Sequence, residues 1–405
     1  MLSADSVGVF SSRKSALAGE RNLACLAMVG EARPDFRTIS DFRKGHLEAC
    51  QAVLVQVVRW AGEAGLVQWG HVSTAGTNIQ GQASRHKAMS SGYMKKAVER
   101  LREASAAWVT QAYQQDAADE AALGRRRGDA LPAELARRAG RLASLEAAMR
   151  RLEAQAKREA QEERPRRAEA EADRQRRGQT RRGKAPKDVE ETPEAKAQSN
   201  CTDPALHIRR TNHQGWDYGG NAPASVAGAG QSSVACDGTE APNDKKQAEP
   251  MAQATQETLA QADIERPTDD TGAPQPLPAT LESGYDSEAA AQALEALGGD
   301  PYMATGRTQP HTPPAEGPES PSTAKERMAA KVQRPEGHEL YARRQVIVAP
   351  VCGQSKEGRG FRRFLLRGMQ QLRGEWRLVC LTHTLLKLWR YGCVPVAASA
   401  RQEVM

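Results

Sequence analysis

Apolar side chains recur at helical spacing in two stretches of the N-terminal third of the chain. The first stretch follows Asp41 and ends at Gly62 and Gly65, so one face of a helix is apolar. Its apolar positions are Leu47, Cys50, Leu54, Val57, Val58 and Ala61. A second helix is predicted from about Ala88, with Met94, Val98, Leu101 and Trp108 on one face.

The segment between these helices, residues 66–73, is short and rich in Val and Trp. This composition predicts a strand that leads into a turn at Ala75-Gly76-Thr77.

Between about Gly124 and Ala197 the chain is rich in Ala, Glu, Arg and Leu. Leucine and methionine occupy two heptad positions over about three heptads, which is typical of a coiled coil or a helical hairpin. One position holds Leu135, Leu142 and Met149, and the other holds Leu145 and Leu152. The apolar seam is lost from Arg158 onward, which predicts a solvated, charged helix.

Residues 201–323 are rich in Gly, Pro, Ser, Asp and Ala, and this composition favours disorder over much of the segment. Two islands are better suited to fold, residues 243–259 and residues 282–307, the second as a helix followed by a strand at 302–305. A Pro-rich stretch at 308–321 indicates a linker. The C-terminal block then combines a strand-like run, Val346-Ile347-Val348, with amphipathic helices that continue through Leu385.

Composition limits the class of protein. Of the 405 residues, 39% are hydrophobic and 4% aromatic, and the sequence pI is about 9.1, which favours an anionic partner. The seven cysteines are scattered without a CxxC pair, and we expect reduced thiols and neither a disulfide framework nor a zinc knuckle. The sequence lacks a signal pattern and a long apolar run, so we expect a cytoplasmic protein without a membrane span.

Positive charge is concentrated in residues 341–390, which hold eleven Lys and Arg against Glu357 and Glu375, whereas the whole chain has a net charge of +7. Clustered guanidinium groups neutralise phosphates and release counterions, so the block suits DNA. A solvated basic helix face is an equally good interpretation of the charge alone.

Eight islands in collinear order resemble bacterial insertion-sequence transposases, the branch with an Asp-Asp-Glu active site on an RNase H-like sheet that a helical segment interrupts. The islands are Arg33–Phe42 (RPDFRTISDF), Gly70–Thr77 (GHVSTAGT), Ala83–Met89 (ASRHKAM), Thr202–Pro204 (TDP), Asn243–Met251 (NDKKQAEPM), Gly284–Glu288 (GYDSE), Ala304–Arg307 (ATGR) and the C-terminal block. The resemblance implies an α/β fold with a mixed sheet flanked by helices, a helical or coiled-coil insertion and a partly disordered middle. It also implies that similar proteins carry a further helical segment before the point where Met1 falls, so the copy is expected to be truncated at its N-terminus.

The resemblance implies a domain organisation as well. The expected parts are 1–65, a partial helical DNA-binding domain; 66–123, the first part of the RNase H-like domain; 124–198, the insertion; 199–307, an eroded second part; 308–334, a linker; 335–392, the basic C-terminal part of the catalytic domain; and 393–405, a tail.

Similar transposases use three carboxylates to hold two Mg²⁺ ions, which activate the attacking hydroxyl and stabilise the leaving oxygen of a DNA phosphodiester. The first acid belongs at Ala75, in a motif whose family form looks like Asp-Gly-Thr. The second belongs at Glu282, which keeps a carboxylate one methylene further out, and the third belongs at Ala349, after Tyr341 and Arg344. We therefore expect Glu282 to be a weak metal ligand, and no Mg²⁺ to be bound productively.

Neighbouring acids could substitute only if they pointed the same way as the lost ligands. Asp286, Glu288 and Glu357 lie nearby in sequence, but none has the spacing to do so, and an acidic helix N-terminus is a sufficient explanation of the first two. The strand expected after residue 204 also looks eroded, because Pro223 removes a ladder hydrogen bond and its Ser and Gly neighbours remove apolar area.

The leading hypothesis is a transposase-family protein that binds DNA but has lost its cutting chemistry, so whether it is an enzyme stays open. The expected DNA-contacting residues are Arg344, Lys356, Arg359, Arg362, Arg363 and Arg367. One alternative is a non-enzymatic protein whose heptad segment forms a homo-oligomer or a mixed oligomer with an intact transposase. Another is a decayed reading frame without function.

Overall fold

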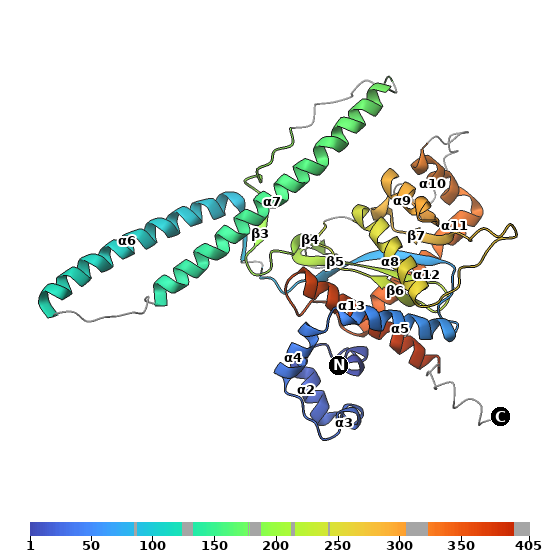
Figure 1. Ribbon diagram of the computed structural model, residues 1–405, viewed down its shortest axis with the longest axis horizontal. Coiled ribbons are helices and arrows are strands. Elements are labelled where there is room, and N and C mark those ends of the chain that lie inside the picture. The colour runs from blue at the N-terminus through green and yellow to red at the C-terminus, as the bar shows by residue number, and fades with distance from the viewer. Residues whose placement is uncertain are drawn as a thin grey trace. The chain divides into compact units, whose positions relative to one another are not determined.

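The computed structural model describes residues 1–84, 87–123, 133–176, 178, 188–211, 215–241, 244–304 and 323–392. The chain divides into two compact units, one made of Met1–Gln82 with Ile208–Met405 and the other of Ala83–His207. The first unit is built around a β-sheet, and the second is mainly a pair of long helices (Figure 1). Within the described ranges, every helix is too short or too polar to cross a membrane.

Six strands of the first unit form one mixed sheet in the order β4-β5-β1-β7-β8, with β6 paired to β5. The central strand β1 is antiparallel to β5 and parallel to β7, and β7 is parallel to β8. The strands are β1 (Val72–Gln80), β4 (His207–Thr211), β5 (Gly215–Ala227), β6 (Ser232–Cys236), β7 (Leu277–Leu281) and β8 (Gly299–Met303). The mixed sheet and the helices around it confirm the predicted α/β fold class.

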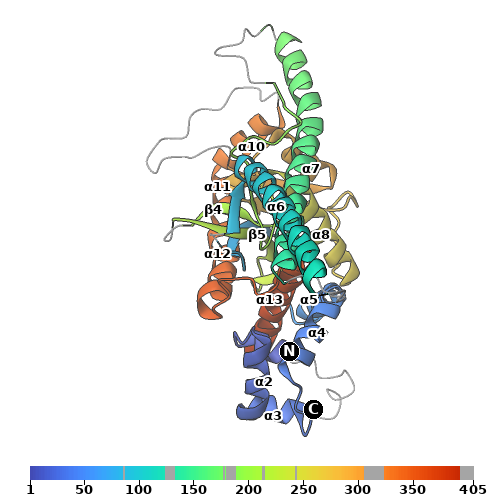
Figure 2. The same ribbon diagram turned by 90° about the vertical axis from the view of Figure 1, so that its left-hand side faces the viewer.

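Alternate side chains of β1 point to opposite faces of the sheet. Helices lie on both faces (Figure 2). Ala75 packs against α12 (Arg344–Gly353) through Ile347, Val348 and Val351. Val72 and Thr74 point the other way, toward α8 (Ala248–Gln261). The remaining helices that pack in this part of the unit are α5 (Ala49–Glu63), α9 (Glu288–Ala296), α10 (Ala324–Gln333), α11 (Pro335–Ala342) and α13 (Met369–Arg390).

Two local predictions are wrong. The strand predicted at 66–73 begins only at Val72 and runs through the predicted turn, because β5 pairs with it over nine positions. The strand-like run at 346–348 is part of α12, where Ile347, Val348 and Val351 are buried. Their spacing fits one side of a helix, and packing on the sheet outweighs the weak β-propensity of three residues.

The strand after residue 204, whose composition looks eroded, is nevertheless formed: β5 is a long strand that is buried from Asp217 to Ala227. Neighbouring elements occupy the space beside its small residues. A Cβ added to Gly220 would lie 2.7 Å from Cδ1 of Leu372, and one added to Gly219 would lie 2.6 Å from the carbonyl oxygen of Ile79. The apolar volume that β5 lacks is thus supplied by the elements that press against it.

Pro223 lies inside this strand without interrupting its ladder with β1. Its carbonyl oxygen accepts a hydrogen bond from the Asp237 N–H at 3.2 Å, on the side of β5 away from β1. Within an extended strand the nitrogen and oxygen of one residue point the same way, so the missing N–H also faces Asp237. The Trp376 indole donates a second bond to the same oxygen at 2.9 Å.

The second unit is a helical hairpin of α6 (Ser91–Leu123) and α7 (Ala133–Arg176), with the short strands β2 (Ala88–Ser90) and β3 (Gln198–Asn200) paired at its base. Leu145, Ala148 and Leu152 of α7 pack against Met94 and Val98 of α6. The described part of the heptad seam is therefore covered by the same chain, as in the hairpin alternative. The side chain of Leu135 lies outside the described residues.

Residues 201–304 include the strands β4 to β8 and the helices α8 and α9, and short stretches of this segment lie outside the described residues. The expected linker lies outside the described residues up to 322, and residues 324–333 form α10, which begins with a capping box between Thr323 and Glu326. The expected tail at 393–405 also lies outside the described residues.

Candidate functional site

The parallel register of β1 and β7 brings Glu282 beside Ala75. Thr74 pairs with Leu281, and Glu282 follows in an extended conformation at the carboxyl end of β7. Paired residues of parallel strands point to the same face, so Glu282 emerges on the side of Ala75 and α12. The sheet thus places together two positions that are about 200 residues apart in sequence.

Arg344, in the first turn of α12, reaches this carboxylate. Its Nη1 donates to Oε1 of Glu282 at 2.9 Å, with side chains that are 17% and 36% exposed. Burial raises the pKa of Glu282, and the Arg344 guanidinium acts against that shift. Lys356 is half-buried nearby, and burial lowers the pKa of its amine.

The two alanines expected to replace acids lie in different surroundings. Ala75 is buried in the sheet under α12, whereas Ala349 is exposed on α12, one residue after the buried Val348. Neither methyl group can donate an electron pair to a cation. In the described part of the chain, His, Cys, Asp and Glu form no group of three or more that could hold a metal ion.

Sequence reasoning missed Asp244, which lies on the opposite side of β1. Its Oδ1 accepts a hydrogen bond from Nδ2 of Asn221. A Cβ added to Gly76 would lie 2.6 Å from Oδ1, and one added to Gly284 would lie 3.0 Å from Oδ2. Two glycines from separate motifs therefore make room for one carboxylate, and glycine in both motifs was the available signal.

The acids considered as substitutes each have another partner. Asp286 forms an ion pair with Lys325 at 2.7 Å. Glu288 lies in the first turn of α9 and accepts the backbone N–H groups of Ala324 and Lys325, which caps α10. Glu357 pairs with Arg362 at the surface.

Arg359 is buried, which removes it from the residues that could contact DNA. Its Nη1 donates to the carbonyl oxygen of Val379 and its Nη2 to that of Asp5, both at 2.8 Å. The guanidinium also lies over the ring of Phe10. Spacing in the sequence grouped Arg359 with Arg362 and Arg363. In the folded chain, however, the Arg359 side chain points into the protein interior, whereas the other two are exposed.

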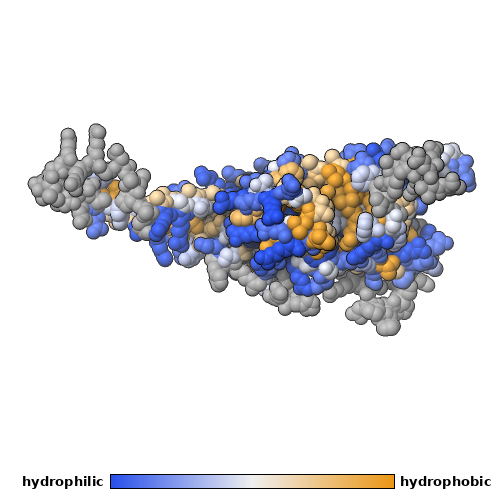
Figure 3. Space-filling view, turned by 90° about the horizontal axis from the view of Figure 1, so that it is seen from below, coloured by the Kyte–Doolittle hydropathy of each residue, from blue (hydrophilic) through white to orange (hydrophobic). Residues whose placement is uncertain are grey.

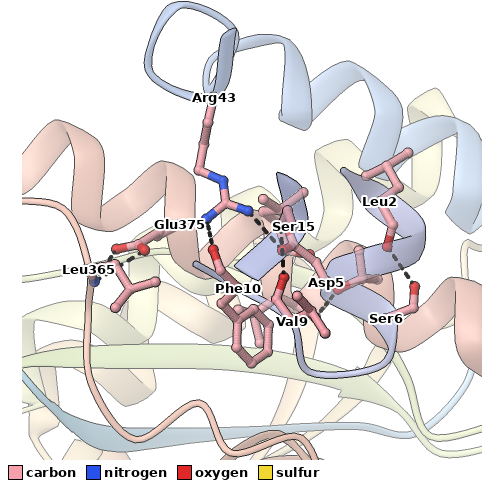
Figure 4. A network of polar contacts seen from close by, with 12 residues as sticks. Leu2, Asp5, Ser6, Val9, Phe10, Ser15, Arg43, Leu365 and Glu375 are labelled. Atoms are coloured by element: carbon pink, nitrogen blue, oxygen red, sulfur yellow. Dashed lines mark hydrogen bonds and ion pairs between the residues drawn. The ribbon is translucent and has the colours of Figure 1, made fainter. Parts of the chain in front are cut away.

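Arg359 thereby bonds to Asp5, which belongs to a buried group of polar contacts with Arg43, and Glu375 lies close by (Figure 4). Asp5 of α1 (Leu2–Ser6) pairs with Arg43 of α4 (Phe36–Gly45) at 2.8 Å. Glu375 of α13 accepts the N–H groups of Leu365 and Leu366. The helices α2 (Ser12–Arg21) and α3 (Leu23–Val29) complete this N-terminal segment.

An apolar groove of about 710 Å³ lies among the N-terminal helices, and its lining includes Met28, Ile39, Phe42 and Leu381. Figure 3, seen from the side of these helices, shows hydrophobic residues gathered at the surface. The lining of the groove does not include Glu282 or Arg344, so the groove is separate from that pair.

Three other arginines of the basic block are exposed along the end of β1. Arg363 forms a bridge with Gln80 and donates to its Oε1 at 2.7 Å. Arg367 donates to the carbonyl oxygen of Gln82 at 3.3 Å, and Arg362 pairs with Glu357. The loop at 359–368 therefore presents a row of positive charge on a fixed strand end.

The chain matches no curated protein and no solved structure. Residues 317–389, which include α10, α11, α12 and most of α13, match the family model described as a transposase DDE domain.

Proposed function

We propose that this chain is a DNA-binding protein of the transposase type in which metal-dependent strand cleavage is absent. The observation that carries the proposal is the state of Glu282: its neighbour on β1 is Ala75, and its own carboxylate is bonded to Arg344. The match of residues 317–389 to a transposase DDE domain supports DNA as the substrate class.

The residues present do not fit the Mg²⁺ pair that the family typically uses. Mg²⁺ requires oxygen ligands in near-octahedral geometry, and a two-metal site needs carboxylates that bridge or flank both ions. Ala75 and Ala349 supply no oxygen, and Arg344 competes for the Glu282 carboxylate. Asp244 lies toward the α8 face, where Gly76 points, and does not replace Ala75.

The exposed arginines support DNA binding. Arg362, Arg363 and Arg367 follow one another on a loop held to β1, so their charges act on the same stretch of phosphate backbone. Each neutralised phosphate releases condensed counterions, which favours association at low salt. Phosphate contacts position a protein on DNA without reading its sequence.

Incubation of the chain with nicked and intact duplex DNA in Mg²⁺ or Mn²⁺ tests the proposal, with binding and cleavage read from the same mixture. We expect the unmodified chain to bind DNA without cutting it. Arg362→Ala/Arg363→Ala should weaken binding. It should also lower the salt slope, the slope of log affinity against log salt concentration, by the amount expected for about two phosphate contacts.

The matched control for charge is Lys325→Ala/Arg327→Ala, which removes two cations paired with Asp286 and Glu295 on another face. Its salt slope should stay that of the unmodified chain. Cleavage by the unmodified chain contradicts the lost chemistry, and a salt slope that is equal in all variants contradicts the DNA surface.

A further inference from the structure

The contact between Arg344 and Glu282 is one in which another anion could replace the Glu282 carboxylate. Only one hydrogen bond, from Nη1 to Oε1, joins the two groups, although a guanidinium can bind a carboxylate with two. The Nε of Arg344 is buried and lacks a partner among the described residues. The pair is also partly open to solvent, where ion pairs contribute little to stability.

The Arg344 guanidinium is nevertheless held in place. It lies 5.5 Å from the centre of the Tyr341 ring, one turn earlier in the chain, and its helix is anchored on the sheet by Ile347, Val348 and Val351. Loss of the Glu282 contact would therefore leave a positioned cation at the carboxyl end of β7.

Lys356 provides a second cation for the same place. Its ammonium interacts electrostatically with Glu357 and Arg362 and, more weakly, with Glu282, and the structure gives it no hydrogen bond or ion pair within the described ranges. The side chain is half-buried, so its charge is screened less than that of a surface lysine. Two cations thus act on the Glu282 carboxylate, and Asp244 is a second acid whose charge reaches it, whereas the methyl groups of Ala75 and Ala349 add no charge.

We propose that Arg344 and Lys356 form a binding site for a phosphate group, and that the Glu282 carboxylate occupies this site from within the chain. The inference rests on the proposed function, because it names the DNA phosphodiester as the group that competes with Glu282. A carboxylate and a phosphate present similar oxygen acceptors to a guanidinium, so one excludes the other. Arg344 is masked in the unmodified chain, and DNA contacts it only after Glu282 is displaced or neutralised.

The variants Glu282→Gln, Arg344→Gln and the double variant distinguish masking from simple contact in a DNA-binding titration over a range of salt. Glu282→Gln should bind a short duplex about 3- to 10-fold more tightly, with a salt slope steeper by about 0.9. Arg344→Gln alone should bind no more tightly than the unmodified chain, because it removes a cation that is already occupied and leaves the Glu282 carboxylate unpaired. The double variant should lose the gain of Glu282→Gln.

Glu295→Gln is the matched control, since it removes an exposed carboxylate that is paired with Arg327 on α10. It should leave affinity and salt slope unchanged. Equal affinity of Glu282→Gln and the unmodified chain overturns masking. A double variant that binds as tightly as Glu282→Gln overturns it too, because the gain in affinity would then not depend on Arg344.

A second measurement tests the site without DNA, so that failure of DNA binding is a separate result. Inorganic phosphate, compared with NaCl of equal ionic strength, should raise the Tm of Glu282→Gln more than that of the unmodified chain or the double variant. Equal shifts in all three proteins overturn the phosphate site. A phosphate-specific shift in a protein that does not bind DNA retains the site and overturns the proposed function.

Discussion

At the scale of residues, two buried acids in the network of Figure 4 carry unusual proton affinities. Burial raises the pKa of Glu375 to about 7 and that of Asp5 to about 6, although Arg43 acts against both shifts. In the folded state each of these two carboxyl groups then keeps its proton at a pH where the same group of the unfolded chain has released it. Stability from these groups is complete below their ordinary pKa and is lost as the pH rises toward the folded pKa.

Glu375→Gln should therefore remove a loss of folding stability that grows as the pH rises. Between pH 4.5, the ordinary pKa, and about 7, the unmodified chain loses stability from this group, and the variant does not. At pH 8 we expect the variant to gain about 1 to 3 kcal/mol in free energy of unfolding, and almost nothing at pH 4.5. Urea denaturation at both pH values measures the difference, in which the other titrating groups cancel.

The surface variant Glu357→Gln is the control, since its carboxylate is exposed and paired with Arg362. It should show no gain in free energy of unfolding at pH 8, because its carboxylate is at the surface and not buried. A gain for Glu375→Gln that is equal at both pH values would show that the buried charge is not its source.

At the scale of elements, the hairpin of α6 and α7 is held by a seam that faces inward. Leu145 is 1% exposed and packs with Met94 and Val98 of the other helix, while α7 from Arg158 onward carries ion pairs such as Arg164 with Glu191. The described part of this seam is thus used inside one chain, and the oligomer alternative stays a prediction.

Leu145→Ala should loosen the hairpin locally. Truncation of a buried leucine to alanine costs about 2 to 5 kcal/mol, and here the loss falls within α6, α7 and their contact. Hydrogen exchange of amides in residues 91–123 and 136–160 should accelerate, whereas exchange in β1 and β5 should stay as it is. Val109→Ala, at a position that is 38% exposed on α6, is the control and should leave both unchanged. Faster exchange in the sheet would show that the two units are coupled.

At the scale of the whole molecule, the beginning of the chain is joined to its C-terminal helix through Arg359. This guanidinium donates to the carbonyl oxygens of Asp5 and Val379, which lie on α1 and α13. A buried cation that loses its partners, or partners that lose their cation, costs several kcal/mol, so the network acts as one attachment.

Arg359→Ala should release the N-terminal helices from α13. We expect faster proteolysis within residues 1–45 and little change in the salt slope of DNA binding, because the buried guanidinium does not face phosphates. Arg367→Ala should show the reverse, since its side chain is exposed on the loop beside β1. Unchanged proteolysis in Arg359→Ala would refute the attachment.

Spacing alone determined the elements whose buried faces are local. The predicted helix after Asp41 appears as α5, with Cys50, Leu54, Val57, Val58 and Ala61 all buried, because a 3.6-residue period fixes which side chains share a face. The leucines of α7 were found for the same reason. The motif resemblance likewise named Glu282 and Arg344, although it could not say that they contact each other.

Only the tertiary structure decided which of two similar residues is used for which purpose. Arg359 and Arg363 are four positions apart in one basic run, yet one is buried among carbonyl oxygens and the other is exposed on a strand end. The roles of three further residues also depend on contacts with residues elsewhere in the sequence. Asp244 lies against Gly76 of β1, Gly220 against Leu372, and Pro223 is hydrogen-bonded to Asp237. Local pattern encodes helices, whereas burial, partner and charge state depend on contacts that the chain makes only when folded.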